Sequence, residues 1–173
     1  MLRLDLICSL LTSFGLLTGC SSDSATTPVT PALKYVRYSG TIHQPTTGAD
    51  LIVKMSGVWT FDASGTFIRG ADTVVVLDAS AYGIPGATTM TGTTRCAVIS
   101  GKEAWAEGDV LTSTQPQFFP TGTSSVTHLL IANGVPTGGS GPKDFWYPTG
   151  NLCTDKPAGY RAYPLEGGTL TFP

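Results

Sequence analysis

Charged residues are scarce in this chain. They make up 13% of its 173 residues, about half of the ~25% that is usual in globular domains. The formal net charge is −2, and acidic and basic side chains are scattered singly along the sequence. Because no basic stripe is available to neutralise phosphates, we expect no nucleic-acid partner.

Long apolar runs and helical patterns are also missing. The longest apolar stretch, residues 6–17, is interrupted by Ser, Thr and Gly and is shorter than the about 20 apolar residues that cross a bilayer. No long window repeats apolar side chains every ~3.6 residues. We therefore expect any helix in the folded part to be a single turn.

Sequence signatures of catalysis are absent as well. The chain has neither the G-x-S-x-G pattern of serine hydrolases nor the H-E-x-x-H pattern of zinc peptidases. Its two histidines, His43 and His128, fall in or beside predicted strands, where a single histidine is usually a surface residue. No cysteine has a second cysteine or histidine at zinc-ligand spacing. We expect no enzymatic activity, cofactor or metal.

The N-terminus carries an export signal instead. Arg3 precedes the apolar stretch, which is followed by Leu17-Thr18-Gly19-Cys20. These four residues resemble the lipobox of bacterial lipoproteins, and the alternative is an ordinary secretory signal. The resemblance implies a signal peptide over residues 1–19 and lipid on Cys20, which would anchor the protein to a membrane of the cell envelope. Ser21 resembles the signal for outer-membrane sorting, if the host has two membranes.

A tether and a single β domain are predicted after the signal. Residues 20–32 are rich in Ser, Thr and Pro and lack apolar periodicity, which is typical of a flexible linker. Residues 33–173 contain short runs of alternating apolar and polar side chains separated by Gly- and Pro-rich turns. The predicted strands cover residues 34–42, 51–62, 66–68, 73–77, 88–100, 103–112, 126–132, 144–147 and 169–172. The Gly-rich segment 134–141 is expected to be a flexible loop.

The strand count and turn spacing predict the fold class. Many short strands must close on themselves or pack in two layers, because a single sheet would leave an apolar face in water. The sequence thus predicts an all-β domain, a small antiparallel β-sandwich or flattened β-barrel of about 8–9 short strands.

One disulfide is expected. Cys8 leaves with the signal and Cys20 takes the lipid, so Cys96 and Cys153 remain as the only pair in the exported domain. Export places them in an oxidising compartment. The alternation from Met90 to Val98 predicts that Cys96 points into the core.

The C-terminal half resembles an uncharacterised family of secreted bacterial β-domains. The matching features are a strand-turn-strand over residues 96–110, Ala132-Asn133-Gly134 followed by Asp144, then Cys153, and a closing strand over residues 167–172. The family has Asp where this chain has Ala132. The resemblance implies a fold and brings no activity with it.

A binding surface is predicted around Trp105. Strand alternation places Trp105 with Glu103 and Glu107 on the face opposite Ala104 and Ala106. There it would cover a second layer, stack on an arginine such as Arg95 or Arg161, or meet a ligand. Further aromatic residues, Phe118, Phe119, Phe145, Trp146 and Tyr147, could form a binding platform or fill the core.

Three functions compete at this stage. The first is a noncatalytic structural or interaction module of the cell envelope, with a protein or glycan partner. The second is a small-ligand-binding barrel, loosely similar to lipocalins, which requires an apolar cavity. The third is an envelope hydrolase, which requires a cleft that joins a carboxylate or histidine to a nucleophile.

Overall fold

The computed structural model divides the chain into two units, Met1–Thr30 and Pro31–Pro173. It describes residues 32–45, 51–80, 83–143, 152–155 and 162–173, all within the second unit. The lipobox with Cys20, the predicted strand 144–147 with Phe145 and Trp146, and Arg161 lie outside the described residues.

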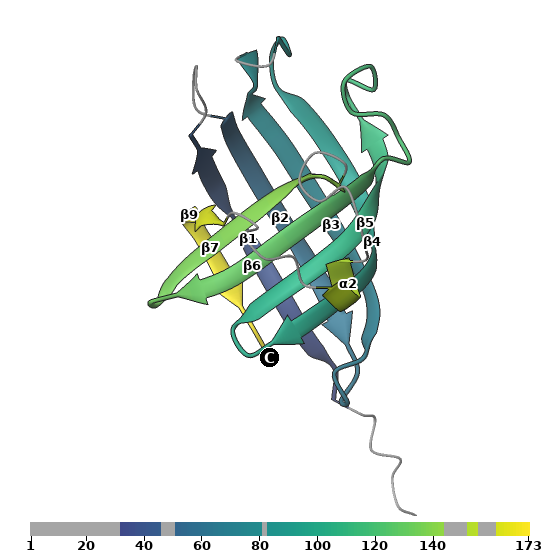
Figure 1. Ribbon diagram of the computed structural model, residues 1–173, viewed down its shortest axis with the longest axis vertical. Helices are drawn as coiled ribbons and strands as arrows, with labels where there is room; N and C mark the ends of the chain where they lie inside the picture. Colours follow the sequence, from purple (N-terminus) through teal and green to yellow (C-terminus); the bar gives the residue numbers. More distant parts are fainter. Residues whose placement is uncertain (1–31, 46–50, 81–82, 144–151, 156–161) are drawn as a thin grey trace, which may run out of the picture. The chain divides into compact units, whose positions relative to one another are not determined.

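Nine antiparallel strands form one nearly closed barrel-shaped sheet, which confirms the predicted fold class (Figure 1). The sheet order is β8-β7-β6-β5-β4-β3-β2-β1-β9, so the first seven strands form a meander in which each pairs with the next along the chain. The strands are β1 Lys34–Gln44, β2 Leu51–Phe61, β3 Phe67–Asp78, β4 Thr88–Ser100, β5 Glu103–Ser113, β6 Ser124–Ala132, β7 Val135–Pro142, β8 Tyr163–Pro164 and β9 Glu166–Thr171.

Two-residue alternation determines which side chains enter the barrel. In β1, burial recurs at every second residue from Val36 to Gln44, and in β2 Val53, Met55, Trp59 and Phe61 face inward. Inward-facing apolar residues from β1 to β6 therefore build most of the core, as the alternation in the sequence predicts, and Leu165 and Leu170 complete it.

One C-terminal segment nearly closes the barrel, because its two strands pair with different partners. β8 pairs with β7, through Tyr163 opposite Gly138, and β9 pairs with β1. Between them Leu165 is buried and donates its amide N–H to the carbonyl of Pro136 at 2.9 Å. Gly168 allows β9 to lie close to β1, because a Cβ there would lie 1.9 Å from the carbonyl oxygen of Ser39.

Two predictions of local structure were wrong. The strands predicted over 66–68 and 73–77 are one continuous strand, β3, which begins at Phe67, because the intervening Arg-Gly-Ala-Asp segment pairs with β2 throughout. The Gly-rich segment 134–141, predicted to be a flexible loop, begins with the turn at Gly134 and continues as β7. Its glycines pair with β6 in regular register, and Gly138 leaves room for Met55 and Leu129 of the core.

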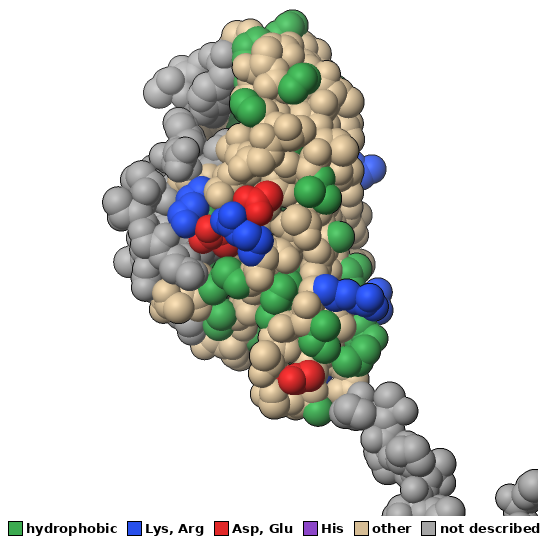
Figure 2. Space-filling view, turned by 90° about the vertical axis from the view of Figure 1, so that its right-hand side faces the viewer, with side chains coloured by type: hydrophobic (Ala, Val, Ile, Leu, Met, Phe, Trp, Pro, Cys, Tyr) green, Lys and Arg blue, Asp and Glu red, His purple; other side chains and the backbone are tan. Residues whose placement is uncertain are grey.

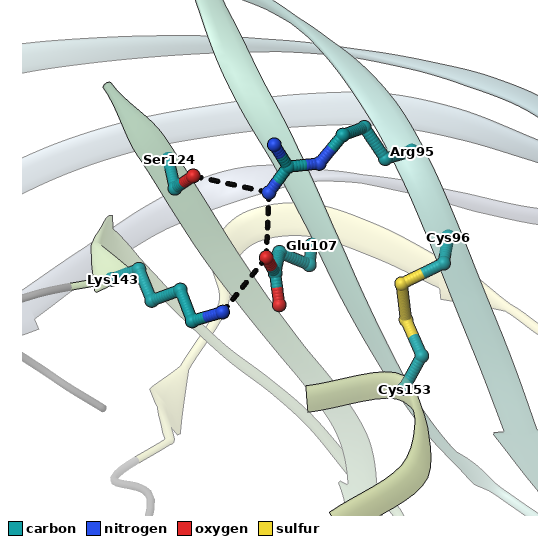
Figure 3. Close-up of a disulfide and its surroundings, with 6 residues drawn as sticks. All are labelled: Arg95, Cys96, Glu107, Ser124, Lys143 and Cys153. Atoms are coloured by element: carbon teal, nitrogen blue, oxygen red, sulfur yellow. Dashed lines mark hydrogen bonds and ion pairs between the residues drawn. A yellow bond between two sulfur atoms is a disulfide. The ribbon is translucent and has the colours of Figure 1, made fainter. Parts of the chain in front are cut away.

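The Cys96–Cys153 disulfide is present in the structure, with a Cα–Cα distance of 6.2 Å (Figure 3). Cys153 lies in the four-residue helix α2, Leu152–Asp155. The prediction that Cys96 points into the core was wrong. A bulge at Arg95 shifts the register of β4 against β5, so Ala97 is buried in the core and Cys96 faces outward, toward α2.

Candidate ligand-binding site

The barrel interior consists of a filled half and a hollow half. In the half where β1 begins and β2 ends, Val36, Trp59 and Phe61 are 0% exposed. The rings of Phe61 and Phe67 meet edge to face with their centroids 5.8 Å apart. Large aromatic side chains leave no room for a ligand in this half.

The other half contains a cavity of about 290 Å³. It lies where β1 ends and β2 begins, and its mostly apolar wall includes Val53, Val74, Val76, Met90, Val110 and Phe119. Val74 and Met90 point inward and still have solvent-accessible surface. Their accessibility is explained by the hollow that they face.

The segment between β5 and β6 forms part of the cavity rim. Phe118 and Phe119 line the cavity from this segment, and Phe118 is 42% exposed. The side-chain amide of Gln115 donates hydrogen bonds to the carbonyls of Pro85 and Ala87, at 2.8 and 3.3 Å. Gln115 thereby ties this segment to the connection between β3 and β4.

A polar cluster around Asp72 lies between the filled and hollow halves. Asp72 lines the cavity, and its Oδ1 accepts hydrogen bonds from the Tyr38 hydroxyl and, at 2.9 Å, from Trp59 Nε1. Its Oδ2 accepts one hydrogen bond, from Thr94 Oγ1 at 2.8 Å. The three donors come from three different strands, β1, β2 and β4. The Asp72 carboxylate of β3 therefore links four strands by side-chain hydrogen bonds inside the barrel.

Two glycines make room for this cluster. A Cβ at Gly57 would lie 2.5 Å from Asp72 Oδ1 and 2.6 Å from the Tyr38 hydroxyl. A Cβ at Gly70 would lie 2.7 Å from Thr94 Oγ1. Both glycines occupy inward-facing positions of their strands, where a larger residue would displace the hydrogen-bonded side chains.

The electrostatics of the cluster are dominated by burial. Burial raises the pKa of the Asp72 carboxyl, and the three hydrogen bonds oppose that shift. The pKa of Tyr38 is also raised, by burial first and by the neighbouring Asp72 charge second. The groups that bond to Asp72 are all neutral, so no side-chain cation in the described part of the chain compensates its negative charge.

A second polar pair extends the cluster along the cavity wall. Thr127 Oγ1 and Ser140 Oγ lie 3.1 Å apart, and both residues line the cavity. Thr127 also interacts with the Tyr38 hydroxyl. The cavity therefore combines a mostly apolar wall with this polar cluster, and Gln44 at the end of β1 also lines it.

The predicted binding surface on β5 lies on the outer face of the barrel, as the alternation predicts. Trp105 is only 5% exposed and stacks on the His128 ring, with centroids 5.0 Å apart. His128 Nε2 lies 2.8 Å from Glu103 Oε1, and burial lowers the pKa of this histidine. His128 is thus a buried residue, contrary to the expectation of a surface position.

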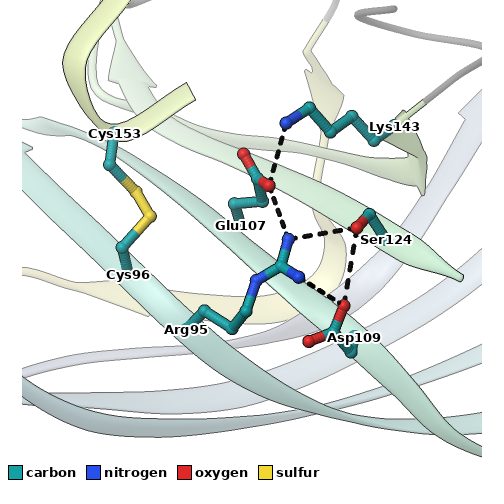
Figure 4. Close-up of polar contacts among 7 residues, drawn as sticks. All are labelled: Arg95, Cys96, Glu107, Asp109, Ser124, Lys143 and Cys153. Carbon is teal, nitrogen blue, oxygen red and sulfur yellow. Dashed lines mark hydrogen bonds and ion pairs between the residues drawn. A yellow bond between two sulfur atoms is a disulfide. The ribbon is translucent and has the colours of Figure 1, made fainter. Parts of the chain in front are cut away.

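Glu107 is held within a group of charged residues (Figure 4). Its Oε1 pairs with Arg95 Nη2 at 2.5 Å and with Lys143 Nζ at 2.9 Å, and Arg95 Nη1 pairs with Asp109 at 2.8 Å. Acidic and basic groups balance one another here. We interpret the group as a structural support of the bulge at Arg95.

The remaining predicted residues do not join these clusters. His43 is partly exposed on β1 and lies 3.4 Å from Glu166 of β9.

The face shown in Figure 2 has small groups of acidic and basic atoms amid largely uncharged surface. Among the described residues, no three His, Cys, Asp or Glu side chains are grouped so that they could hold a metal ion. No helix in the described part of the chain is long and apolar enough to cross a membrane.

Comparison with known proteins gives no match. No family model, no curated protein and no solved structure is significantly similar to this chain. The function must therefore be argued from the cavity itself.

The sequence did contain a signal for the residues around Asp72. Asp72 is two residues from Val74 and four from Val76, so it shares their inward face. A single carboxylate in phase with core valines is unusual, because buried charges require partners. Tyr38 and Thr94 show no comparable signal, since either is ordinary in a strand.

Proposed function

We propose that this protein is a noncatalytic, lipid-anchored binding module that takes up a small, largely apolar molecule in its barrel. The observation that carries the proposal is the apolar cavity of about 290 Å³ in the hollow half. A cavity of about 150 Å³ lined by apolar residues is large enough to hold benzene. The present cavity has room for a ring with a short chain.

The cavity favours ligand binding over a purely structural role. A barrel that served only as a spacer would be more stable with a filled interior, because unfilled apolar volume forfeits packing contacts. The other half of the same barrel is filled by Trp59 and Phe61. The contrast between the halves supports a ligand site in the hollow half.

A cavity-filling substitution tests the proposal. Val74→Phe places a ring into the cavity from β3, and we expect it to weaken binding of n-butylbenzene at least about tenfold, measured by titration calorimetry. The matched control is Val75→Phe, the next residue of the same strand, which faces outward and should leave the affinity unchanged. Equal binding by both variants would place the probe elsewhere and overturn the proposal.

The proposed anchor is lipid on Cys20, which would hold the barrel at the outward face of a cell-envelope membrane. Support comes from the lipobox-like Leu17-Thr18-Gly19-Cys20 and from the polar segment that follows it. More than one acyl chain gives stable anchoring. A ligand carrier or sensor at that surface would meet its ligand outside the cytoplasm.

Replacement of the lipidated residue tests the anchor. We expect Cys20→Ala to abolish labelling with radioactive palmitate and to release the protein from membranes or leave it as an uncut precursor, because no other thiol occupies the lipobox position. Cys153→Ala is the control and should still be labelled. Unchanged labelling of Cys20→Ala would contradict the proposed anchor.

A further inference from the structure

We infer that the ligand of this cavity carries a protonated amine next to its apolar body, and that the ammonium group binds Asp72. The inference rests on the proposed function, since it names the chemical class of the molecule that the cavity takes up. It follows from the position of Asp72, from its unfilled hydrogen-bonding capacity and from its uncompensated charge.

Asp72 is reachable from the cavity. It lies on the inward face of β3, lines the hollow half and keeps part of its surface accessible. The neighbouring residues of the same face, Val74 and Val76, are part of the apolar wall. A ligand that fills the cavity along β3 therefore meets an apolar surface over most of its length and a carboxylate at one end.

The carboxylate has room for one more donor. Two carboxylate oxygens offer about four lone-pair sites. Oδ1 uses two of them, for Tyr38 and Trp59, and Oδ2 uses one, for Thr94. One site on Oδ2 therefore remains for a ligand.

The charge of Asp72 selects a cation over a neutral donor. Its three protein donors are neutral groups, and burial disfavours the ionised form, as the raised pKa indicates. An ammonium group would compensate the charge and donate the missing hydrogen bond at once. A neutral alcohol or amide would supply only the hydrogen bond.

A metal ion fits this site less well than an amine. Hard cations such as calcium take six to eight oxygen ligands. Among the described residues that line the cavity, Asp72 is the one carboxylate, and most of the others are apolar. An organic amine needs a single anionic partner and uses the apolar wall for the rest of its surface.

The test compares two probes of the same size, 3-phenylpropylamine and n-butylbenzene, which differ in having an ammonium or a methyl group at the chain end. We expect the wild-type protein to bind the amine at least about tenfold more tightly in calorimetry at neutral pH. Asp72→Asn should abolish this preference. Asp78→Asn, an exposed carboxylate at the end of the same strand, is the matched control and should retain it.

The outcomes separate the two proposals. If the wild-type protein binds the hydrocarbon as tightly as the amine, or if Asp72→Asn keeps the preference, the amine inference is overturned and the apolar cavity site stands. If neither probe binds up to its solubility limit, the proposed function fails and the inference fails with it.

A second measurement covers the case in which Asp72→Asn does not fold. The Trp59 indole N–H donates to Asp72, so an ammonium at this carboxylate should shift the Trp59 indole resonance in the wild-type protein. The shift should be at least about twofold larger with the amine than with n-butylbenzene at saturation. Equal shifts would contradict the inference.

Discussion

Cys153→Ser is expected to lower the melting temperature by more than about 8 °C. The disulfide closes a segment with a sequence separation of 57, and in the chain-entropy model a loop of that length contributes about 4 kcal/mol. For a domain of this size each kcal/mol corresponds to about 2 to 4 °C. The loss should be measured by calorimetry.

The local consequence should be largest in α2. Four residues, Leu152–Asp155, are too few to form a stable helix by themselves. Without the bond to Cys96 we expect faster amide hydrogen exchange in α2, while the core strands keep their protection. The double variant Cys96→Ser/Cys153→Ser should lose no more stability than the single variant. Free thiols at both Cys96 and Cys153 in the folded, unreduced wild-type protein, located by mass spectrometry, would refute this prediction.

Asp72→Leu should lower the free energy of unfolding by about 4 kcal/mol. The substitution removes the acceptor of three hydrogen bonds and leaves the Tyr38 hydroxyl, the Trp59 indole and the Thr94 hydroxyl without it. Each buried donor left unpaired costs about 1 to 3 kcal/mol. Urea denaturation monitored by circular dichroism measures the change.

Asp72→Asn is the matched comparison for this prediction. The asparagine oxygen can accept from Tyr38 and Trp59, and its amide can donate to the Thr94 hydroxyl, which also accepts. We therefore expect a loss of no more than about 1 kcal/mol. If the leucine variant were as stable as the asparagine variant, the hydrogen bonds to Asp72 would make no contribution to the free energy of unfolding.

The barrel could be predicted from sequence because its strands are regular. In β2 and in the first part of β5 the two-residue alternation is regular, and Ala104 and Ala106 face inward while Trp105 faces outward, as predicted. The disulfide pairing was predicted by elimination and is present. The local pattern was sufficient to predict a strand and its inward face wherever every second residue faced the core.

The orientation of Cys96 could not be predicted, because a β-bulge leaves no clear mark in the sequence. The extra residue, Arg95, reverses the alternation between Thr94 and Ala97. Each residue of β4 after the bulge therefore faces the opposite side of the sheet from the side that an unbroken alternation starting at Met90 would give it. A single residue thereby moves the disulfide from the core to the outer face.

The cavity could not be predicted from the local sequence pattern either. Alternation identifies the inward residues of each strand, and it does not say whether they meet across the barrel. Trp59 and Phe61 fill one half, whereas valines and Met90 line the other. The size of the interior depends on which side chains from different strands lie at the same height along the barrel axis. That arrangement follows from strand register and closure, which involve residues as distant as Tyr38 and Leu170.

The central claim is that the hollow half of the barrel is the ligand site, and its most direct test is to locate a bound probe by nuclear Overhauser effects in the methyl-labelled protein. With n-butylbenzene bound, the account predicts contacts from the probe ring to the methyl groups of Val74 and Met90. Contacts only to Leu77 and Leu111, which are exposed apolar side chains, would show surface binding and contradict the claim.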